Sequence, residues 1–356
     1  MKEEMRTKKY ETVPCILCGS TLYTVVYPSI TTVDAPLHMK YSAAQGILCT
    51  DQVVTCNSCS LLFVNPRLSS ETIIDACAKG DDEVYVSQGT GRMETFKKGL
   101  RLVEKFSPQK GKLLDVGAAA GFFMNVAKNN GWEVSGVEPN TWLCEYGKKH
   151  FNIPILPTTL EHARYKKSFF DVVTIWDVIE HIPHPERTLH EIQRILKPGG
   201  IFILSTPNAD SVFFKIFGRK WWFFLSHHLF YFSPKTIKIF LRKEGFTVLS
   251  IQPHWQSLQI GYMFTMFRKL NQQSFLGTFA GVIEKVLRAV KLYNLKITYY
   301  AGQMDIVARK CCYGCCGNRR RNHRIGSSIQ TGIAWKKSST DRKECSTRRT
   351  CRHVSI

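Results

Sequence analysis

The chain has 356 residues, of which 44% are hydrophobic and 22% charged, so it is long enough for more than one globular domain. It holds no stretch of 18 apolar residues, and its first residues lack the apolar core of a signal peptide. We therefore expect a cytoplasmic protein, and we expect its thirteen cysteines to form metal sites or free thiols rather than a disulfide scaffold.

Two Cys-x-x-Cys pairs lie in the first 66 residues and are formed by Cys15, Cys18, Cys56 and Cys59. Two such pairs can supply the four thiolates of a tetrahedral Zn²⁺ site. Gly19, directly after the first pair, is typical of a chain that turns tightly around a metal. We predict a small zinc-ribbon-like module over residues 1–66, whose Zn²⁺ is structural because four thiolates leave no open position. The alternative is two pairs of free thiols.

Residues 67–111 are predicted to form a helical connector, because Leu100, Val103 and Phe106 recur at helical spacing. From residue 112 to 310, short β-branched runs alternate with amphipathic segments, which predicts an α/β fold with a doubly wound, mostly parallel sheet. The predicted strands are residues 112–116, 132–138, 170–176, 201–205, 246–251 and 304–308. The predicted helices are residues 122–130, 141–150, 186–196 and 234–244, the second of them capped by Thr141.

About 50 residues separate the last two predicted strands, which is longer than a hairpin needs. Residues 255–300 hold six Lys or Arg and one Glu, and one helical face carries Val282, Val286, Ala289, Val290 and Tyr293. We predict an acceptor-side insertion or lid helix packed on the domain. The alternative is a basic amphipathic surface that makes peripheral contact with an anionic membrane.

The C-terminal end of the chain is strongly basic. Residues 309–356 hold 13 Lys or Arg and two Asp or Glu, about half of the net charge of +21. Residues 311–356 show no apolar periodicity, so we predict a basic, disordered tail or a segment read through past the natural end of the domain. A contact with nucleic acid or an anionic membrane is the alternative for this charge.

A glycine-containing loop follows the first predicted strand, running from Asp115 through Gly117 and Ala119 to Gly121. Glycines at such a turn let the backbone approach a ligand closely. Glu138 comes 17 residues after Gly121, at the end of the second predicted strand, where an acid can accept both ribose hydroxyls of an adenosine. These two features fit any adenosine-containing cofactor, NAD included.

The segments LLDVGAAAGFF, GVEPN and DVIEHIPHP, with LKPGG after them, together resemble class I S-adenosylmethionine-dependent methyltransferases. The resemblance runs from about residue 112 to 252 and resumes at 302–310. It implies a Rossmann-like sheet of seven strands and S-adenosylmethionine as cofactor. Ala119 departs from it, because a Gly often stands there; the turn is more constrained, and we expect binding to survive.

The same resemblance assigns roles to single residues. Gly117 and Gly121 would pass the methionine part of the cofactor, and Glu138, with Pro139 beside it, would hold the ribose. Asp115 would orient the loop or reach the cofactor's amino group, with a purely structural role as the alternative. The remaining cofactor-binding candidates are Leu160 and Glu161 near the adenine and Asp177 near the methionine end.

Two histidines are candidates for catalysis. His228, in the pattern H-x-x-Y-F-S, resembles the base-region histidine of sugar C-methyltransferases that have zinc-binding N-termini. It could take the acceptor's proton, and a packing or substrate-contact role stays open. His181 closes the run Asp177-x-x-Glu180-His181, which resembles the metal triplet of ubiquinone-pathway O-methyltransferases and would suit Mg²⁺. The alternative for this run is a helix-start contact that shapes the pocket.

The sequence therefore predicts a methyltransferase that acts on a small molecule: a sugar, a glycan precursor or a quinone-like phenol. A zinc-containing nucleic-acid-binding protein or RNA methyltransferase that uses the basic tail is the alternative. Since the signatures of the usual RNA-binding modules do not occur, nucleic acid is not the expected partner. A relative with a decayed site is disfavoured by the intact Gly117, Gly121 and Glu138. No feature of the sequence indicates an oligomeric state.

Overall fold

The computed structural model describes residues 10–30, 37, 49–79, 82–270 and 275–311. The chain divides into two units, Met1–Cys312 and Tyr313–Ile356, and all described residues belong to the first. The predicted tail, with its cysteines at 312, 315 and 316, lies outside the described residues, apart from Cys311.

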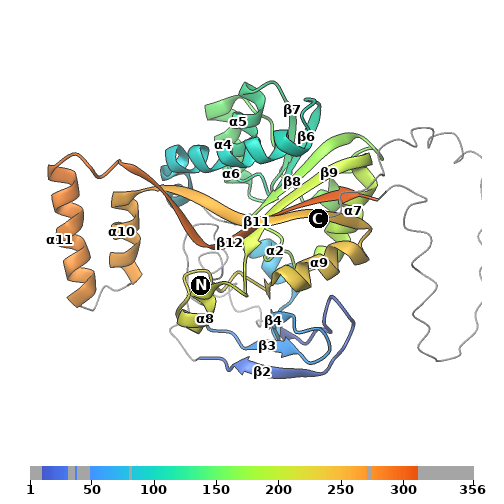
Figure 1. The fold of residues 1–356 in the computed structure, drawn as a ribbon, viewed down its shortest axis with the longest axis horizontal. Helices are drawn as coiled ribbons and strands as arrows, with labels where there is room; N and C mark the ends of the chain where they lie inside the picture. Colours follow the sequence, from blue (N-terminus) through green and yellow to red (C-terminus); the bar gives the residue numbers. More distant parts are fainter. Residues whose placement is uncertain (1–9, 31–36, 38–48, 80–81, 271–274, 312–356) are drawn as a thin grey trace, which may run out of the picture. The chain divides into compact units, whose positions relative to one another are not determined.

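A six-stranded mixed sheet forms the centre of the first unit, with the strand order β11-β12-β9-β8-β6-β7 (Figure 1). Its strands are β6 (Lys112–Val116), β7 (Glu133–Val137), β8 (Phe170–Trp176), β9 (Leu196–Pro207), β11 (Phe246–Gln259) and β12 (Lys296–Lys310). Strand β6 pairs in parallel with β7 and β8, and β8 with β9, while β12 runs antiparallel to β9 and β11. The strand order reverses between β6 and β8, which is where open sheets of this kind bind ligands.

Both faces of the sheet are covered, which explains why its central strand β8 is almost entirely apolar and buried. Leu113 and Val172 pack in a cluster with α4 and α5, whereas their neighbours Leu114 and Val173 pack in a second cluster with α7 and α9. The helices around the sheet are α4 (Gly89–Phe106), α5 (Phe122–Asn129), α6 (Thr141–Phe151), α7 (Pro185–Ile195) and α9 (Pro234–Lys243), with the short turn η1 (Leu160–His162). The predicted α/β, doubly wound, mostly parallel architecture is confirmed.

The seventh strand that the resemblance implied is not formed within the described residues. Beside β7 there is a single parallel bridge between Val137 and Leu156. Pro154 and Pro157 flank Ile155-Leu156, and since proline has no N–H to donate, this stretch is too short to pair as a strand. The count of seven strands is therefore corrected to six with one isolated bridge.

Two local predictions need correction as well. Helix α6 is capped by Asn140 rather than Thr141, because the Asn140 side chain accepts a hydrogen bond from the Leu143 N–H at 3.1 Å. Strands β11 and β12 are longer than predicted and pair from Phe246 with Lys310 to Gln259 with Lys296. They run past the last pairing with β9, at Gln303, as a two-stranded ribbon that leads to helices α10 (Ile260–Leu270) and α11 (Phe275–Ala289).

A second sheet has the order β10-β4-β3-β2, and one cysteine pair, Cys56 and Cys59, lies at the turn between β3 and β4, whereas Cys15 and Cys18 precede β2. Strand β10 comes from the segment after β9, so strands from both regions of the chain share this sheet. Its strands are β2 (Tyr23–Tyr27), β3 (Val53–Cys56), β4 (Leu62–Val64) and β10 (Phe230–Tyr231). The other short elements are β1 (Tyr10–Glu11), β5 (Arg67–Leu68), α2 (Ser70–Ala78), α3 (Glu83–Ser87), α8 (Val212–Phe217) and η2 (Gly218–Lys220).

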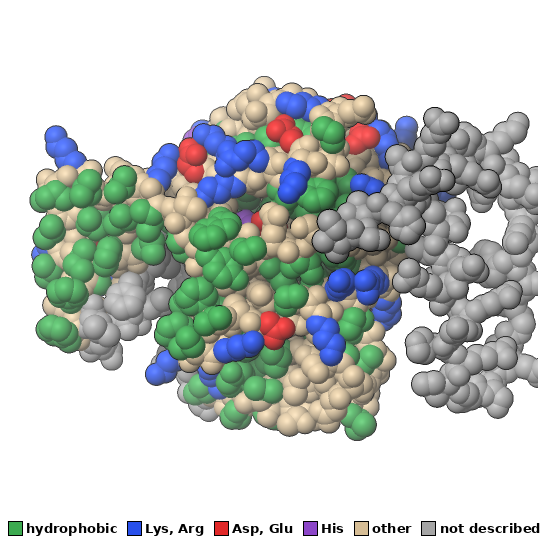
Figure 2. All heavy atoms as spheres, in the orientation of Figure 1, with side chains coloured by type: hydrophobic (Ala, Val, Ile, Leu, Met, Phe, Trp, Pro, Cys, Tyr) green, Lys and Arg blue, Asp and Glu red, His purple; other side chains and the backbone are tan. Residues whose placement is uncertain are grey.

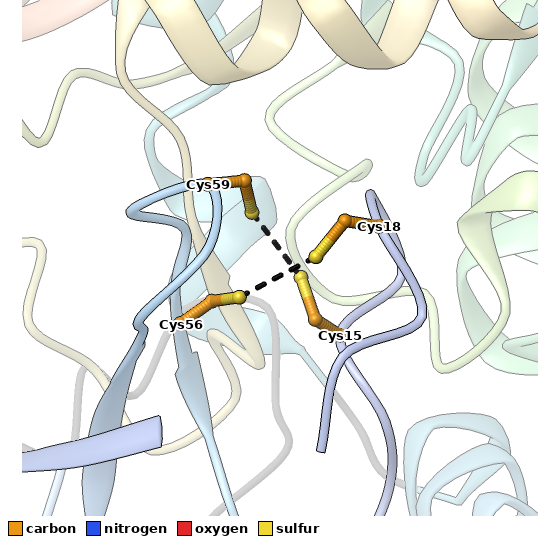
Figure 3. A group of neighbouring side chains, drawn as sticks. All are labelled: Cys15, Cys18, Cys56 and Cys59. Atoms are coloured by element: carbon orange, nitrogen blue, oxygen red, sulfur yellow. Dashed lines mark hydrogen bonds between the residues drawn. The ribbon is translucent and has the colours of Figure 1, made fainter. Parts of the chain in front are cut away.

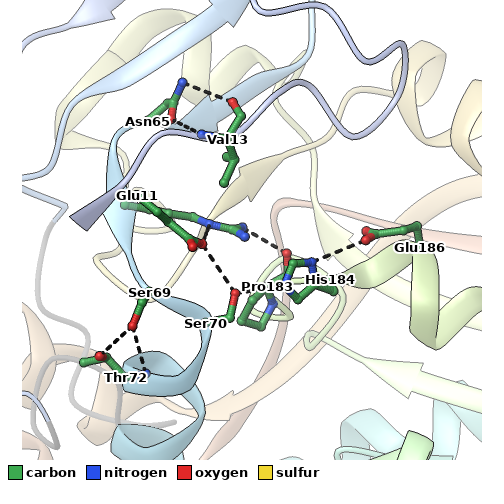
Figure 4. Close-up of polar contacts among 10 residues, drawn as sticks. Glu11, Val13, Asn65, Ser69, Ser70, Thr72, Pro183, His184 and Glu186 are labelled. Carbon is green, nitrogen blue, oxygen red and sulfur yellow. Dashed lines mark hydrogen bonds and ion pairs between the residues drawn. The ribbon is translucent and has the colours of Figure 1, made fainter. Parts of the chain in front are cut away.

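Polar contacts of Glu11, Ser70 and His184 join the N-terminal strands to the loop after β8 (Figure 4), with the buried Arg67 among them. The Arg67 guanidinium donates to the Pro183 carbonyl at 2.9 Å and pairs with the Glu11 carboxylate at 3.1 Å. The Ser70 hydroxyl bonds His184 Nε2 at 2.9 Å. Breaking the Arg67 contacts would leave the buried guanidinium charge without a partner, which is costly. This network therefore fixes the loop after β8 against the N-terminal strands.

None of the helices within the described ranges combines the length and the apolar content that crossing a membrane requires.

Candidate functional site

The loop between β6 and α5 lies at the carboxyl end of the sheet and has the backbone that its glycines predict. Gly117 and Gly121 have φ of +71° and +75°, and a Cβ on Gly117 would lie 2.6 Å from the Val178 side chain. Ala119 also has a positive φ, of +45°, which costs an L-residue on the order of 1–2 kcal/mol. Having alanine instead of glycine at position 119 therefore strains the backbone there.

Glu138 reaches this loop from the end of β7. Its carboxylate accepts the Ala119 N–H at 3.0 Å and the Asn140 N–H at 2.9 Å, so two backbone groups hold its orientation. Burial raises its pKa to about 7, against the lowering effect of these two hydrogen bonds. The strained Ala119 thus serves to present an N–H to Glu138.

Asp115, at the end of β6, is fully buried beside this loop. Its carboxylate accepts a hydrogen bond from the Thr174 hydroxyl at 2.7 Å. Burial raises its pKa to about 8, and the charge of Glu138 adds to the effect. A buried carboxyl with one hydrogen-bond donor is a site that a positively charged ligand would stabilise.

Two residues that sequence reasoning missed belong to the same region. Asp82 is buried, lies 3.4 Å from the Asn140 amide nitrogen and raises the pKa of Glu138. Burial raises the pKa of Tyr85 to about 12, and its hydroxyl also experiences the charges of Asp115, Glu138 and Asp177. Both lie in the connector before the first predicted strand, where no spacing pattern marked them.

The other cofactor candidates from the sequence, Pro139, Leu160 and Glu161, follow Glu138 in the chain. Pro139 connects Glu138 to the cap of α6. Leu160 is buried in the core beneath η1, and Glu161 accepts a hydrogen bond from the Thr188 hydroxyl of α7. The structure thus ties Glu161 to α7, and its predicted place near an adenine stays a prediction.

Asp177 follows β8 with a φ of +54° and is held in place by β9 and β12. Its Oδ1 accepts hydrogen bonds from the Ser205 hydroxyl at 2.7 Å and the Gln303 amide at 2.8 Å. Gln303 is in turn bonded by Gln256 of β11. The two glutamines were not predicted, because the sequence around them was interpreted as insertion and closing strand.

The candidate catalytic histidines form a cluster of three together with His227. The ring centroids of His181, His227 and His228 lie 4.6 to 4.9 Å apart, and one ring nitrogen of each lies within 4.8 Å of the others. The His227-His228 pair is brought to His181 because the Glu180 carbonyl accepts the Leu229 N–H at 2.8 Å. The structure therefore unites the two predicted catalytic residues.

His228 has the form of a neutral base. Its Nδ1 lies 2.7 Å from the Phe223 carbonyl oxygen, so Nδ1 carries the proton and Nε2 keeps its lone pair. Burial, and then the neighbouring His227, hold its pKa well below the ordinary value of 6.5. The ring is therefore uncharged at neutral pH, with its single proton on Nδ1.

His181 and Glu180 complete this group. The Nε2 atom of His181 is buried without a hydrogen-bond partner and lies 3.9 Å from Oε1 of Glu180, which also has none. Burial, and then the charge of Asp177, raise the pKa of Glu180 well above its usual range. Its other oxygen accepts the Thr206 hydroxyl at 3.0 Å. Asp177 and Glu180 are thus anchored on adjacent residues of β9, which links the loop site to the histidine cluster.

The predicted Mg²⁺ triplet does not fit this arrangement. Among the described residues, the side chains positioned to share a metal ion are the three histidines and the four paired cysteines, and neither group includes Asp177 or Glu180. Mg²⁺ prefers six oxygen ligands, whereas the group around His181 offers imidazole nitrogens. The described residues therefore do not form the predicted Mg²⁺ site.

The four paired cysteines converge as predicted (Figure 3). Cys15 and Cys59 have their sulfur atoms 3.4 Å apart, and Cys18 and Cys56 have theirs 3.5 Å apart. All four sulfur atoms lie within 4.8 Å of one another. Tetrahedral Zn²⁺ with bonds of about 2.3 Å sets its sulfur ligands about 3.8 Å apart, so the donor set fits this ion.

The two cysteine turns have the same backbone geometry, which supports a shared ligand. The backbone carbonyl of Cys15 accepts a hydrogen bond from the Gly19 N–H at 2.8 Å. In the same way, the backbone carbonyl of Cys56 accepts one from the Ser60 N–H at 2.9 Å. Gly19 and Ser60 both have positive φ, of +74° and +63°. The second turn has serine at the position where the first turn has Gly19. A glycine after the cysteine pair therefore indicated only the first of the two turns.

Comparison with known proteins finds methyltransferases similar to part of this chain. Residues 88–251 match the family described as "Methyltransferase domain". A ubiquinone biosynthesis O-methyltransferase of Azoarcus sp. is 28% identical over 153 residues, which cover 39% of this chain and 66% of that protein. One of Saccharophagus degradans is 33% identical over 106 residues, which cover 28% of this chain and 44% of that protein.

A solved structure described as a SAM-dependent methyltransferase from Archaeoglobus fulgidus aligns with 64% of this chain and 100% of its own, with a TM-score of 0.45 and 19% identity. The present chain spans between 44% and 66% of the length of the two curated relatives.

Proposed function

We propose that this chain transfers a methyl group from S-adenosylmethionine to a small-molecule acceptor, since its residues 88–251 match a family described as a methyltransferase domain. One observation carries this proposal above the others. The carboxylate of Glu138 is fixed by two backbone N–H groups beside the left-handed loop 117–121, at the point where the strand order reverses. This arrangement suits an acid that accepts ribose hydroxyls.

The residues around this loop fit a cationic cofactor. When bound, S-adenosylmethionine supplies a methyl group on a positively charged sulfur. We propose that Glu138 binds the ribose and that Gly117, Gly121 and Asp115 bind the methionine part. Asp177 would lie at the reacting end, with Ser205 and Gln303 fixing its carboxylate. Carboxyls whose pKa is raised by burial gain most from a positive charge placed among them.

We assign His228 as the base that takes the acceptor's proton on Nε2. The hydrogen bond from Nδ1 to the Phe223 carbonyl fixes the tautomer, and this bond strengthens as the ring gains a proton. The new positive charge would form beside His181, whose Nε2 lies 3.9 Å from the Glu180 carboxyl. His181 and Glu180 would thus stabilise the charge rather than contact the acceptor.

Two features bear on the acceptor class, and they favour different acceptors. The curated relatives are named as ubiquinone biosynthesis O-methyltransferases, which favours a phenolic oxygen. The pattern from His228 to Ser233 favours a sugar. In either case the base must remove a proton from a group that is neutral before transfer, and we propose His228 for that step.

We further propose that the four paired cysteines bind a structural Zn²⁺. Their sheet is shared with β10, which directly follows the histidine cluster in the chain. Zinc at this position would hold the turns that support β3 and β4, and through β10 it would hold His228.

The proposal is tested with methyl-labelled S-adenosylmethionine and two acceptor panels, sugar nucleotides and catechol-type phenols. Replacing His228 with Asn should lower turnover by roughly 10²–10⁴-fold and leave cofactor affinity unchanged. His190→Asn, an exposed position on α7, is the matched control and should retain full turnover. Full turnover of His228→Asn would refute the base assignment, and no labelled product from either panel would refute the acceptor classes.

A further inference from the structure

The outer face of α11 is apolar and exposed to solvent. Its side chains follow one another at helical spacings of four and three residues, and together with the residue after the helix they form what we call the apolar stripe. The stripe consists of Phe275 (83% exposed), Phe279 (54%), Val282 (54%), Val286 (53%) and Val290 (54%). Single exposed apolar residues are common, but five on one helical face mark an interaction surface.

The inner side of the same hairpin, where α11 faces α10, contains a buried acidic side chain. Glu284 is buried, and its carboxylate pairs with Arg288 at 3.0 Å and with Arg268 of α10 at 3.4 Å. The small residues Gly277 and Ala280 are also buried on this inner side. Two partly exposed arginines therefore neutralise Glu284 on this side, whereas the apolar stripe lies on the opposite face of α11.

The charge next to the apolar stripe is positive. Lys285 and Lys291 are exposed beside it, and the charge of Glu284 is balanced within the hairpin by its two arginines. A surface that is both apolar and basic complements anionic lipid headgroups, whereas two copies of this chain would bring like charges together.

The location of the hairpin leaves this face accessible. Helices α10 and α11 lie at the end of the β11–β12 ribbon, beyond the last pairing with β9 (Figure 1). Apolar side chains crowd the surface of this end of the molecule (Figure 2). Leu292 and Leu295, in the turn between α11 and β12, are also about half exposed and continue the apolar surface toward the ribbon.

We propose that the apolar stripe inserts into the surface of an anionic membrane, with α11 lying along the interface. The helix has 15 residues, or about 22 Å, and is too short for a hydrocarbon core of about 30 Å. Its large side chains reach the boundary between headgroups and acyl chains, and Lys285 and Lys291 contact the headgroups. This inference does not depend on methyl transfer.

The test is flotation of the full chain with vesicles of phosphatidylcholine alone and of phosphatidylcholine mixed with phosphatidylglycerol. The chain should bind the anionic vesicles, and the triple variant Phe279→Ser/Val282→Ser/Val286→Ser should bind them roughly tenfold more weakly or less. The matched control is Val212→Ser/Ile216→Ser on α8, where the side chains are 66% and 69% exposed and which should bind like the parent chain. Equal thermal midpoints would show that each variant is folded.

A second variant separates charge from apolar contact. Lys285→Gln/Lys291→Gln should reduce the preference for anionic vesicles and leave the fold unchanged. The proposal is overturned if the parent chain does not bind anionic vesicles, or if the triple variant binds as well as the parent, since another basic segment would then account for binding. It is also overturned if sedimentation shows a dimer that the triple variant dissociates, because a second copy would then cover the stripe.

Discussion

Replacing Asp115 with Asn should stabilise the cofactor-free chain in alkaline solution. The Asp115 carboxyl is fully buried, and burial raises its pKa from the ordinary 3.8 to about 8. Below both values the carboxyl is protonated whether the chain is folded or not. Between them the unfolded chain gains by ionising and the folded chain does not, so this group lowers stability as the pH rises.

The magnitude follows from the pKa shift. Each pH unit between the two values costs about 1.4 kcal/mol, which gives about 3 kcal/mol at pH 6 and about 5–6 kcal/mol above pH 8. Asn keeps the oxygen that accepts the Thr174 hydroxyl, and burying its extra amide donors costs about 1–3 kcal/mol at every pH. Between about pH 6 and pH 9 the parent chain should therefore lose about 3 kcal/mol of stability relative to Asp115→Asn.

Urea unfolding of both proteins at these two pH values measures the difference. Asp171→Asn is the control, because this partly exposed carboxyl has a lowered pKa and should show no such relative gain at high pH. Parallel pH dependence in the parent chain and in Asp115→Asn would refute the argument that Asp115 stays protonated in the folded chain.

Three further predictions concern the loop, the histidine cluster and the cysteines. Ala119→Gly should raise the free energy of unfolding by about 0.5–1 kcal/mol, because glycine accepts the positive φ without strain; an unchanged urea midpoint would contradict this. Since burial holds the pKa of His228 well below 6.5, kcat/KM should be level above neutral pH and fall only in more acidic solution, and a fall centred at or above pH 6.5 would contradict the assignment. Cys15→Ser should lose about one equivalent of zinc per chain by metal analysis, whereas Cys77→Ser, a thiol outside the cluster, should keep it; zinc retained in both variants would place the metal elsewhere.

The sequence predicts the centre of the fold well because its strands are buried on both faces. Residues 170–176 were predicted as one continuous apolar strand, and β8 has these bounds. The prediction fails at the edge of the sheet, where Pro154 and Pro157 reduce an implied strand to one bridge. Edge pairing depends on which backbone groups can donate, and hydrophobic pattern alone does not report that.

Site residues that belong to a sequence motif could be predicted. Site residues whose place depends on a tertiary contact could not. The loop glycines and Glu138 carry a pattern of their own, and the structure brings them together. Gln303 lies 126 positions from Asp177, and Asp82 lies 58 positions from Asn140, so no local spacing connects these pairs. His227 precedes His228 directly, yet its role in the cluster follows from the Glu180 carbonyl that draws this segment to His181.

The most direct test of the central claim is calorimetric titration of S-adenosylhomocysteine into the purified full chain, with Glu138→Gln and Glu133→Gln beside it. Glu133 lies at the other end of β7, and its exposed carboxylate pairs with Lys112. We predict binding by the parent chain and by Glu133→Gln, and at least roughly 100-fold weaker binding by Glu138→Gln, since hydrogen bonds to a carboxylate contribute about 1.5–3 kcal/mol each. No binding by the folded parent chain, or equal binding by Glu138→Gln, would contradict the account.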